Sequence, residues 1–390
     1  MLRTIGLTIS LLLPAPTAVA GADGCEPAPP DSLGAAIART DHQVSGNRVS
    51  RGCGPLTGDV VDVELGGTPA WVLPDPSDRG TSWFVVLDDG SVDHVIAEDG
   101  LLPYVSQSET PPLAPGEPPL AVALTEDQLV VGSALGAAGW FRDPLPDTRV
   151  VETPGQALIA LTGPTDRYSH GVLGDGLEAS AITLRDVAGV TSIDAGDVDV
   201  IEGTSALLAD LRGDVRSPEI VVTVSNADSG ARLVAYDLDG EFVAASEPIG
   251  QGYRWLHQVG AGPLGPDGET EIIVVRTPHI GGIVEAYRLV GDRLELVASQ
   301  PGYSSHQLGS SNLDMALLAD ADGDGHLDVV VPRQAMNELA VLARIDDGFE
   351  EIDALPLEGA LTTNVAATPD ADGNLVLAAG TDDGRLHIFR

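Results

Sequence analysis

Short hydrophobic runs alternate with clusters of glycine, aspartate, asparagine and proline along most of the chain. Many of the runs are β-branched, and several alternate apolar and polar positions, which is typical of strands with one face against a core. The clusters between them are typical of tight turns. Few stretches keep the period of an amphipathic helix. The pattern therefore predicts an all-β fold.

A strand, a turn and a second, more β-branched strand recur along the sequence. Clear copies begin at residues 206, 256, 316 and 365, and looser copies begin at residues 70, 119 and 157. Successive starts are 49, 38, 49, 50, 60 and 49 residues apart, so seven units fill the chain. A fixed period of this length is typical of repeat architectures.

The unit that begins at Ala206 shows what each repeat contains. Its four predicted strands are ALLADL, EIVVTV, ARLVAYDL and EFVAASEP, and glycine-containing turns separate them. Four antiparallel strands per repeat are the signature of a β-propeller blade. We therefore expect a seven-bladed β-propeller of four-stranded antiparallel blades.

The two ends of the repeat region complement each other. The last unit, from Val365 to Arg390, supplies three strands and lacks the fourth, whereas residues 59–66 form a strand without a hairpin partner. Placing this N-terminal strand at the outer edge of the last blade closes the ring and removes an open sheet edge. We expect one propeller domain over residues 57–390 and an N-terminal arm over residues 21–56.

The first residues have the pattern of a secretory signal. Arg3 precedes an apolar run from Ile5 to Leu13, and Ala18-Val19-Ala20 fits the small-residue cleavage rule. This predicts a signal peptide over residues 1–20 and export to the periplasm or the extracellular space. A membrane span is a poor alternative because the run is far shorter than the roughly 20 residues that a spanning helix needs.

Two cysteines remain after the predicted cleavage. In an oxidising compartment, Cys25 and Cys53 most simply form one disulfide that ties down the arm. The alternative is a lipid anchor on Cys25, although Asp23 fits a lipoprotein cleavage sequence badly.

Acidic residues outnumber basic ones by 59 to 20, and every base is an arginine, which gives a formal charge of −39. Such a field repels phosphate backbones and anionic lipids, and it concentrates cations. We therefore expect no nucleic-acid partner and no membrane span, and we expect a monomer.

One turn, 320-DADGDGHLDVVVP-332, has an aspartate at every second position, followed by a glycine and a fourth aspartate. Calcium prefers six to eight hard oxygen ligands, and alternating aspartates in a tight turn can direct their carboxylates at one centre. The predicted calcium ligands are the side chains of Asp320, Asp322, Asp324 and Asp328 and the carbonyl of His326. The alternative is an acidic, solvated turn without metal. An EF-hand is excluded because its twelfth position needs glutamate, and that position is Val331.

This loop resembles the calcium loop between the first two strands of a blade in the FG-GAP and VCBS repeat families of integrin-like propellers. The resemblance is specific over Asp320 to Asp328 and extends to the repeat region, although the literal Phe-Gly and Gly-Ala-Pro signature is absent. It implies a calcium ion that clamps a turn and has no catalytic role. The sister loops are weaker: Arg212 replaces a ligand in 210-DLRGDVRSPE, and 370-DADGNL, with Asp370 as its first ligand position, is cut short.

Polar aromatic and imidazole residues gather near unit boundaries, where equivalent positions of successive blades share one face of a propeller. The candidate ligand-binding residues of this face are Arg167, His170, Arg254, His257, Arg276, His279 and His306. The alternative is that each of them packs one blade on the next. The tripeptide Arg212-Gly213-Asp214 also matches an integrin-recognition sequence, which arises easily by chance in such a turn.

The sequence contains no nucleophile elbow, zinc motif, phosphate loop or cofactor fingerprint. The interpretation that best fits these features is a binding or interaction module for a protein or carbohydrate ligand. One alternative is a carbohydrate-active or other hydrolytic enzyme with its site in the propeller funnel, whose catalytic groups would be scattered among loops. Another is a structural element of a surface assembly.

Overall fold

The computed structural model describes residues 47–50, 54–56, 58–74, 82–97, 103–107, 122–125, 128–132, 138–155, 157–310, 312–370 and 372–390. Within these ranges the chain forms strands β1 to β27 and no helix, so the described fold is all-β. Accordingly, no helix there is long and apolar enough to cross a membrane. The predicted signal peptide, Cys25 and Cys53 lie outside the described residues.

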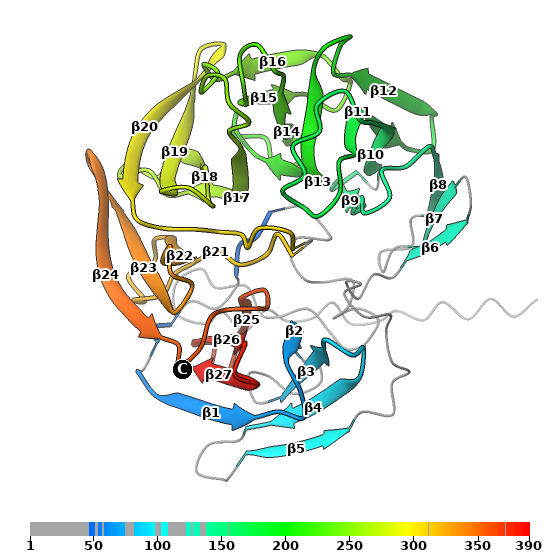
Figure 1. Ribbon diagram of the computed structural model, residues 1–390. Helices are drawn as coiled ribbons and strands as arrows, with labels where there is room; N and C mark the ends of the chain where they lie inside the picture. Colours follow the sequence, from blue (N-terminus) through cyan, green and yellow to red (C-terminus); the bar gives the residue numbers. More distant parts are fainter. Residues whose placement is uncertain are drawn as a thin grey trace, which may run out of the picture.

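The strands form antiparallel sheets arranged around a common centre, as expected for a propeller (Figure 1). The first sheet contains β2 (Pro69–Pro74), β3 (Ser82–Leu87), β4 (Val92–Ile96) and β5 (Tyr104–Gln107). The next contains β6 (Val122–Thr125), β7 (Gln128–Gly132) and β8 (Ala138–Arg142). A later sheet contains β21 (Leu317–Ala319), β22 (Asp328–Pro332), β23 (Glu338–Ile345) and β24 (Gly348–Pro356).

The largest sheet has twelve strands, which fall into three groups of four. They are β9 (Val151–Glu152), β10 (Leu158–Thr165), β11 (Glu178–Arg185) and β12 (Val190–Asp194); β13 (Val200–Ala209), β14 (Glu219–Ser225), β15 (Arg232–Tyr236) and β16 (Phe242–Ala245); and β17 (Leu256–Pro263), β18 (Thr270–Arg276), β19 (Ile283–Val290) and β20 (Arg293–Pro301). Single residue pairs join the groups, namely Ala179 with Ile201 and Ala245 with Arg293. Each group is therefore a unit comparable to the separate sheets.

The last sheet combines the two ends of the repeat region. β25 (Ala366–Pro369), β26 (Leu375–Thr381) and β27 (Arg385–Phe389) come from the C-terminal unit. β1 (Val60–Glu64) pairs antiparallel with β27, with Val60 opposite Phe389 and Glu64 opposite Arg385 (Figure 1). The structure thus places this strand where the sequence analysis places residues 59–66.

The unit that the sequence predicts from residue 157 starts one strand earlier in the structure, with β9. The predicted start corresponds to β10, but the two-residue strand β9 precedes it and pairs with its other edge through Leu158 and Ile159. A strand of two residues shows no alternation of apolar and polar positions, so the sequence pattern could not reveal it. By contrast, the four strands predicted from Ala206 match β13 to β16 in order.

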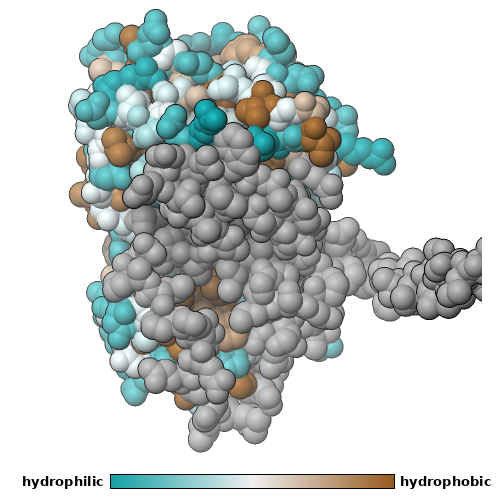
Figure 2. All heavy atoms as spheres, turned by 90° about the vertical axis from the view of Figure 1, so that its right-hand side faces the viewer, coloured by the Kyte–Doolittle hydropathy of each residue, from teal (hydrophilic) through white to brown (hydrophobic). Residues whose placement is uncertain are grey.

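The core lies between neighbouring sheets. The second strands β14 and β22 are buried along their whole length, which explains their continuous β-branched sequences. One cluster packs Val330 and Val341 against Leu377 and Phe389 of the next sheet. On the face shown in Figure 2, hydrophilic residues make up most of the coloured surface, and hydrophobic residues lie between them in small groups.

Candidate functional site

The aspartate-rich loop joins β21 to β22, and Ala319 pairs with Asp328 at its base. Gly323 and Gly325 have φ angles of +77° and +90°. This left-handed region strains residues that carry a Cβ atom, so glycine at both positions allows the chain to fold back sharply. The loop thus brings residues from both of its ends together.

Three carboxylates converge in this loop. Asp320, Asp322 and Asp328 each offer an oxygen, and these oxygens all lie within 4.8 Å of one another. Asp320 and Asp328 are buried, whereas Asp322 is exposed. Oxygen atoms of clustered carboxylates are the ligands that calcium prefers, so this donor set fits the ion that the sequence predicts.

Backbone groups of the loop hold the buried carboxylates in position. Asp320 accepts hydrogen bonds from the N–H groups of Gly323 and Gly325, at 2.8 and 2.9 Å. Asp328 accepts one from the N–H of Ala321 at 3.0 Å. The carboxylates are therefore oriented by the polypeptide itself, which lowers the entropy lost when an ion binds.

The site carries uncompensated negative charge. The pKa of Asp328 is raised to about 7, chiefly by burial and also by the charges of Asp322, Asp324 and Asp320, while the hydrogen bond from the N–H of Ala321 acts in the opposite direction. Burial also raises the pKa of Asp320. None of the ion pairs in the described part of the chain includes either residue. A divalent cation would supply the missing charge.

The other two predicted ligands lie at the outside of the loop. Asp324 is exposed and is not one of the converging carboxylates, and its Oδ1 accepts the N–H of His326 at 2.8 Å. His326 is also exposed. The structure therefore gathers three of the four predicted carboxylates.

Two loops of the twelve-stranded sheet correspond to this loop, namely β13–β14 and β17–β18. Each has a buried glutamate where the aspartate-rich loop has Asp328. Glu219 begins β14 and pairs with Arg212 at 2.5 Å. Glu271 of β18 pairs with Arg288 at 2.5 Å and with Arg344 at 2.9 Å. Arg212 of the Arg-Gly-Asp tripeptide is thus engaged in a structural ion pair.

The short loop at Asp370 folds mainly onto its own first residue. Asp370 accepts hydrogen bonds from the N–H groups of Asp372 and Asn374, and from the Asn374 side chain at 3.0 Å. Among the described residues, three potential metal ligands converge at Asp320, Asp322 and Asp328 and not in the loop at Asp370.

The four candidate histidines lie in loops and strand ends of neighbouring units, together with two aromatic side chains. The ring centroids of His279 and His306 are 4.9 Å apart, and those of His257 and His306 are 6.1 Å apart. Trp255 stacks on His257 at 4.6 Å. His170 lies 5.6 Å from Tyr253, whose ring is more than half exposed. We refer to these six residues as the histidine–aromatic cluster.

Hydrogen bonds fix the protonation of two of these histidines. His306 Nε2 lies 2.6 Å from the carbonyl oxygen of Ser310, which can only accept, so this nitrogen carries a proton. Burial lowers the pKa of His306 to about 4, and burial also lowers that of His279. In the neutral pair, His306 Nδ1 accepts from His279 Nε2 at 2.7 Å. Both rings are therefore neutral hydrogen-bonding groups near pH 7.

The three candidate arginines are engaged elsewhere or exposed. Arg276 forms an ion pair with Glu285 at 2.6 Å. Arg167 is exposed and donates to the carbonyl oxygen of Asp197 at 3.1 Å, and Arg254 is exposed. The candidate arginines thus contribute little to the cluster, and one ionisable contact of its histidines is Glu202, whose Oε1 lies 2.7 Å from His170 Nδ1.

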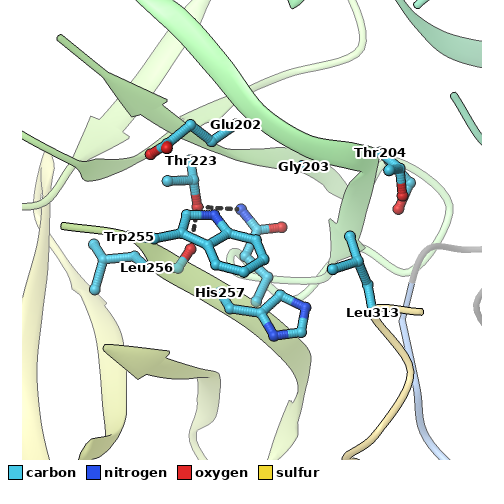
Figure 3. Close-up of a pocket in the computed structure, with 10 residues that line it drawn as sticks. Glu202, Gly203, Thr204, Thr223, Trp255, Leu256, His257 and Leu313 are labelled. Atoms are coloured by element: carbon cyan, nitrogen blue, oxygen red, sulfur yellow. Dashed lines mark hydrogen bonds between the residues drawn. The ribbon is translucent and has the colours of Figure 1, made fainter. Parts of the chain in front are cut away.

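A small cavity lies beside the cluster, with Glu202, Thr204, Thr223, Trp255 and His257 among its walls (Figure 3). Its volume of about 20 Å³ accommodates one water-sized group. The Nε1 atom of Trp255 and the Oγ1 atom of Thr204 are buried and have no hydrogen-bond partner. Leaving such a group unsatisfied costs about 1–3 kcal/mol, so a polar occupant is favoured.

Next to this cavity lies a group of carboxylates that the sequence analysis missed. The pKa of Glu178 is raised to about 9, chiefly by burial and also by the charges of Glu202, Asp147 and Asp175. Glu178 Oε2 and the hydroxyl of the buried Tyr168 have no hydrogen-bond partner. These acids are scattered over 56 residues of sequence, from Asp147 to Glu202, so no local motif marks them.

No protein-family model and no curated protein matches the chain. Similar solved structures include BBS1N in complex with ARL6DN, at 13% identity over 86% of this chain and 97% of that chain, with a TM-score of 0.49. The WD40 beta propeller domain of Doa1 matches at 9% identity over 85% and 96% of the two chains, with a TM-score of 0.43. BamB from Moraxella catarrhalis matches at 15% identity over 86% and 95%, with a TM-score of 0.38. The likeness concerns the overall fold and extends to no particular residue.

Proposed function

We propose that the protein is an exported, calcium-stabilised β-propeller that acts as a binding module. Its propeller has seven blades of the FG-GAP/VCBS type, and the ring closes where β1 pairs with β27. The observation that carries the binding role is the histidine–aromatic cluster, in which stacked imidazole and aromatic rings and two unpartnered buried polar atoms adjoin a small cavity.

Seven blades are supported by the grouping of the strands. Dividing the twelve-stranded sheet at its two single-pair joints gives three units, which add to the four separate sheets. Closure is supported by five antiparallel pairs between β1 and β27, which cover an edge that would otherwise be open.

Calcium would be held by Asp320, Asp322 and Asp328 and would supply positive charge between carboxylates that otherwise repel one another. The chain itself contributes a turn that backbone N–H groups hold in place before the ion arrives. The ion would stabilise the loop between β21 and β22. Calcium titration followed by calorimetry, with EDTA as the reversal, tests this part of the proposal.

Carbohydrate is the ligand class that the cluster suits best. Aromatic faces stack on sugar rings, and neutral hydrogen-bonding groups suit sugar hydroxyls better than charged ligands. The Nε1–H of Trp255 and the Thr204 hydroxyl could satisfy their hydrogen bonds with one hydroxyl or water in the cavity. A protein ligand is the other outcome that the experiment distinguishes.

A glycan array with purified protein tests the binding role. Tyr253→Ala should weaken binding about tenfold, because it removes the exposed ring of the cluster. Phe242→Ala is the matched control, since Phe242 is similarly exposed but lies in β16 outside the cluster. Absence of any glycan signal would point to a protein ligand, and release of sugar products would replace the binding role by hydrolysis.

A further inference from the structure

Residues 47–50 and 54–56, which precede β1, form backbone contacts with three of the sheets. Val49 forms a parallel bridge with Leu318, Ser50 donates to the carbonyl of Leu318 at 2.7 Å, and Leu318 donates to the carbonyl of Arg48 at 2.8 Å. The Asn47 side chain exchanges two hydrogen bonds with the backbone of Ala261, at 2.6 and 2.8 Å. Residues 47–50 therefore add backbone pairing to the strand that leads into the aspartate loop. We call residues 47–50 and 54–56 the strap.

The second part of the strap lies directly on the aspartate loop. The N–H of Leu56 donates to the carbonyl of Ala321 at 2.9 Å. A Cβ atom on Gly323 would lie 2.6 Å from Cδ of Pro55, so the strap and the turn are in close contact. Leu375 of the next sheet donates to the carbonyl of Gly54 at 3.3 Å. Residues 54–56 thus join the loops of two adjacent sheets.

A single residue, Ala321, links the strap to the buried carboxylate of Asp328. Ala321 accepts from Leu56 through its carbonyl and donates through its N–H to Asp328 at 3.0 Å. Its neighbours in sequence, Asp320 and Asp322, carry the other two converging carboxylates. A shift of these carboxylates therefore moves the group to which the strap is bonded.

The strap leads straight into the strand that joins the two ends of the repeat region. Gly58 donates to the carbonyl of Arg390 at 2.8 Å, and Arg390 donates to that of Asp59 at 3.0 Å. β1 and its pairing with β27 begin at the next residue, Val60. The aspartate loop and this joint are thus connected through fewer than ten residues of chain.

We propose that calcium binding in the Asp320–Asp328 loop and docking of strap residues 54–56 are coupled, so that each strengthens the other. The proposal rests on the calcium site of the proposed function. Coupling between two sites is reciprocal, and typical values change each affinity about 5- to 150-fold. Calcium release would loosen residues 54–56 from the β21–β24 sheet and from the sheet in which β1 pairs with β27.

Two glycines of the loop provide a matched pair of variants. Gly323 and Gly325 both have positive φ angles and both donate to Asp320, so alanine strains the backbone similarly at either position. Only at residue 323 does the added Cβ meet the strap, because nothing lies within 4 Å of a Cβ at residue 325. In isothermal titration with calcium, Gly323→Ala should bind about tenfold more weakly than Gly325→Ala.

A third variant leaves the loop untouched. Pro55 is exposed, so Pro55→Ala removes contacts with Gly323 without disturbing a core. It should weaken calcium binding about fivefold relative to the wild type, the lower end of the usual range of coupling. Hydrogen exchange supplies the reciprocal measurement: the Leu56 amide should exchange at least tenfold more slowly with calcium than with EDTA. The Ser246 amide, which donates to Leu233 in another sheet, should exchange at the same rate in both.

The outcomes separate the two proposals. If the wild-type protein binds no calcium, the calcium site and the coupling are both overturned. If calcium binds but the two glycine variants weaken it equally, and Leu56 exchanges at one rate in both buffers, the coupling is overturned and the calcium site stands. A selective effect at residue 323, together with calcium-dependent protection of Leu56, supports both.

Discussion

Three four-stranded units, β13–β16, β17–β20 and β21–β24, each bury a carboxylate near the start of their second strand. They differ in which group neutralises its charge. Glu219 and Glu271 are fully buried and meet arginines, whereas Asp328 is 2% exposed and meets none of the arginines in the described part of the chain. Burying an ionised carboxylate without a partner is strongly unfavourable. The same position therefore has an arginine as counter-charge in two units, whereas no arginine of the described residues pairs with it in the third.

Glu178 offers a further contrast in another unit. It is buried among carboxylates, and its pKa of about 9 keeps it protonated near neutral pH. An arginine and a proton are thus two ways to bury a carboxylate in this fold, and the proposed calcium ion would be a third. The difference teaches that an acidic turn indicates a metal site only where no arginine is already in place.

The largest effect is expected from the arginine that bridges two sheets. Arg344 is almost fully buried and pairs with the buried Glu271 across 73 residues of sequence. Arg344→Met leaves Arg288 as the remaining partner, and it should lower the free energy of unfolding by about 3 kcal/mol. Urea denaturation measures this change, which should be the same with calcium and with EDTA.

The control for Arg344 is the exposed pair of Arg293 and Glu247. Arg293→Met should change the unfolding free energy by less than about 0.5 kcal/mol, because exposed ion pairs contribute little. If Arg344→Met were as mild as this control, the arginine would not be the counter-charge that the comparison requires.

The next effect concerns the loop without arginine. With calcium at one hundred times its dissociation constant, the wild type should gain about 2.7 kcal/mol over the EDTA state. Asp328→Asn should abolish this calcium-dependent gain in stability, because it replaces a buried, charged calcium ligand by a neutral amide. In EDTA above about pH 7 the variant should equal or exceed the wild type, because the pKa of Asp328 of about 7 marks a buried charge that asparagine lacks. A variant that still responds fully to calcium would contradict the assignment.

Protonation of Glu178 should make the free energy of unfolding depend on pH. Its folded pKa of about 9 lies above the ordinary value of 4.5, so its stabilising contribution is complete below about pH 4.5 and is lost as pH rises through about 9. Between about pH 6 and 7.5 the stability of the wild type relative to Glu178→Gln should fall by about 2 kcal/mol. Denaturation curves at several pH values measure this slope. A difference that does not vary with pH would mean that Glu178 is ionised in the fold.

The sequence predicted the structural features that depend on residues close together along the chain. The alternating aspartates predicted a turn in which Asp320, Asp322 and Asp328 converge, and the repeat from Ala206 predicted the order of β13 to β16. Both depend on residues that are close along the chain. The pairing of the N-terminal strand with β27 is distant, but the missing fourth strand of the last unit left one place for it.

The features that the sequence could not predict are contacts between residues far apart along the chain. The pairing of Arg344 with Glu271 and the docking of residues 54–56 on Ala321 join segments with no mutual pattern. Strap residues bind through backbone groups, which every residue type carries. The candidate arginines were grouped with the histidines by their neighbours in sequence, but the structure gives Arg276 a separate partner in Glu285.

The smallest expected effect tests whether a calcium ion can replace an arginine as the counter-charge of a buried carboxylate. In the β13–β14 loop, Arg212 is half exposed and neutralises Glu219, while Oδ1 of the nearby Asp210 is buried without a partner. Arg212→Asp therefore removes the internal counter-charge and adds a carboxylate at the position that corresponds to Asp322 in the aspartate-rich loop. In EDTA this variant should be less stable than the wild type.

Calcium should restore about 1 kcal/mol of this loss beyond its effect on the wild type, which corresponds to a calcium concentration a few times the new dissociation constant. Arg212→Met is the matched control, because it removes the same counter-charge without adding a ligand. Thermal denaturation of both variants over a calcium series measures the difference. If the two respond equally to calcium, the carboxylate triad alone does not make the site, and the backbone N–H groups that orient Asp320 and Asp328 are what the β21–β22 loop adds.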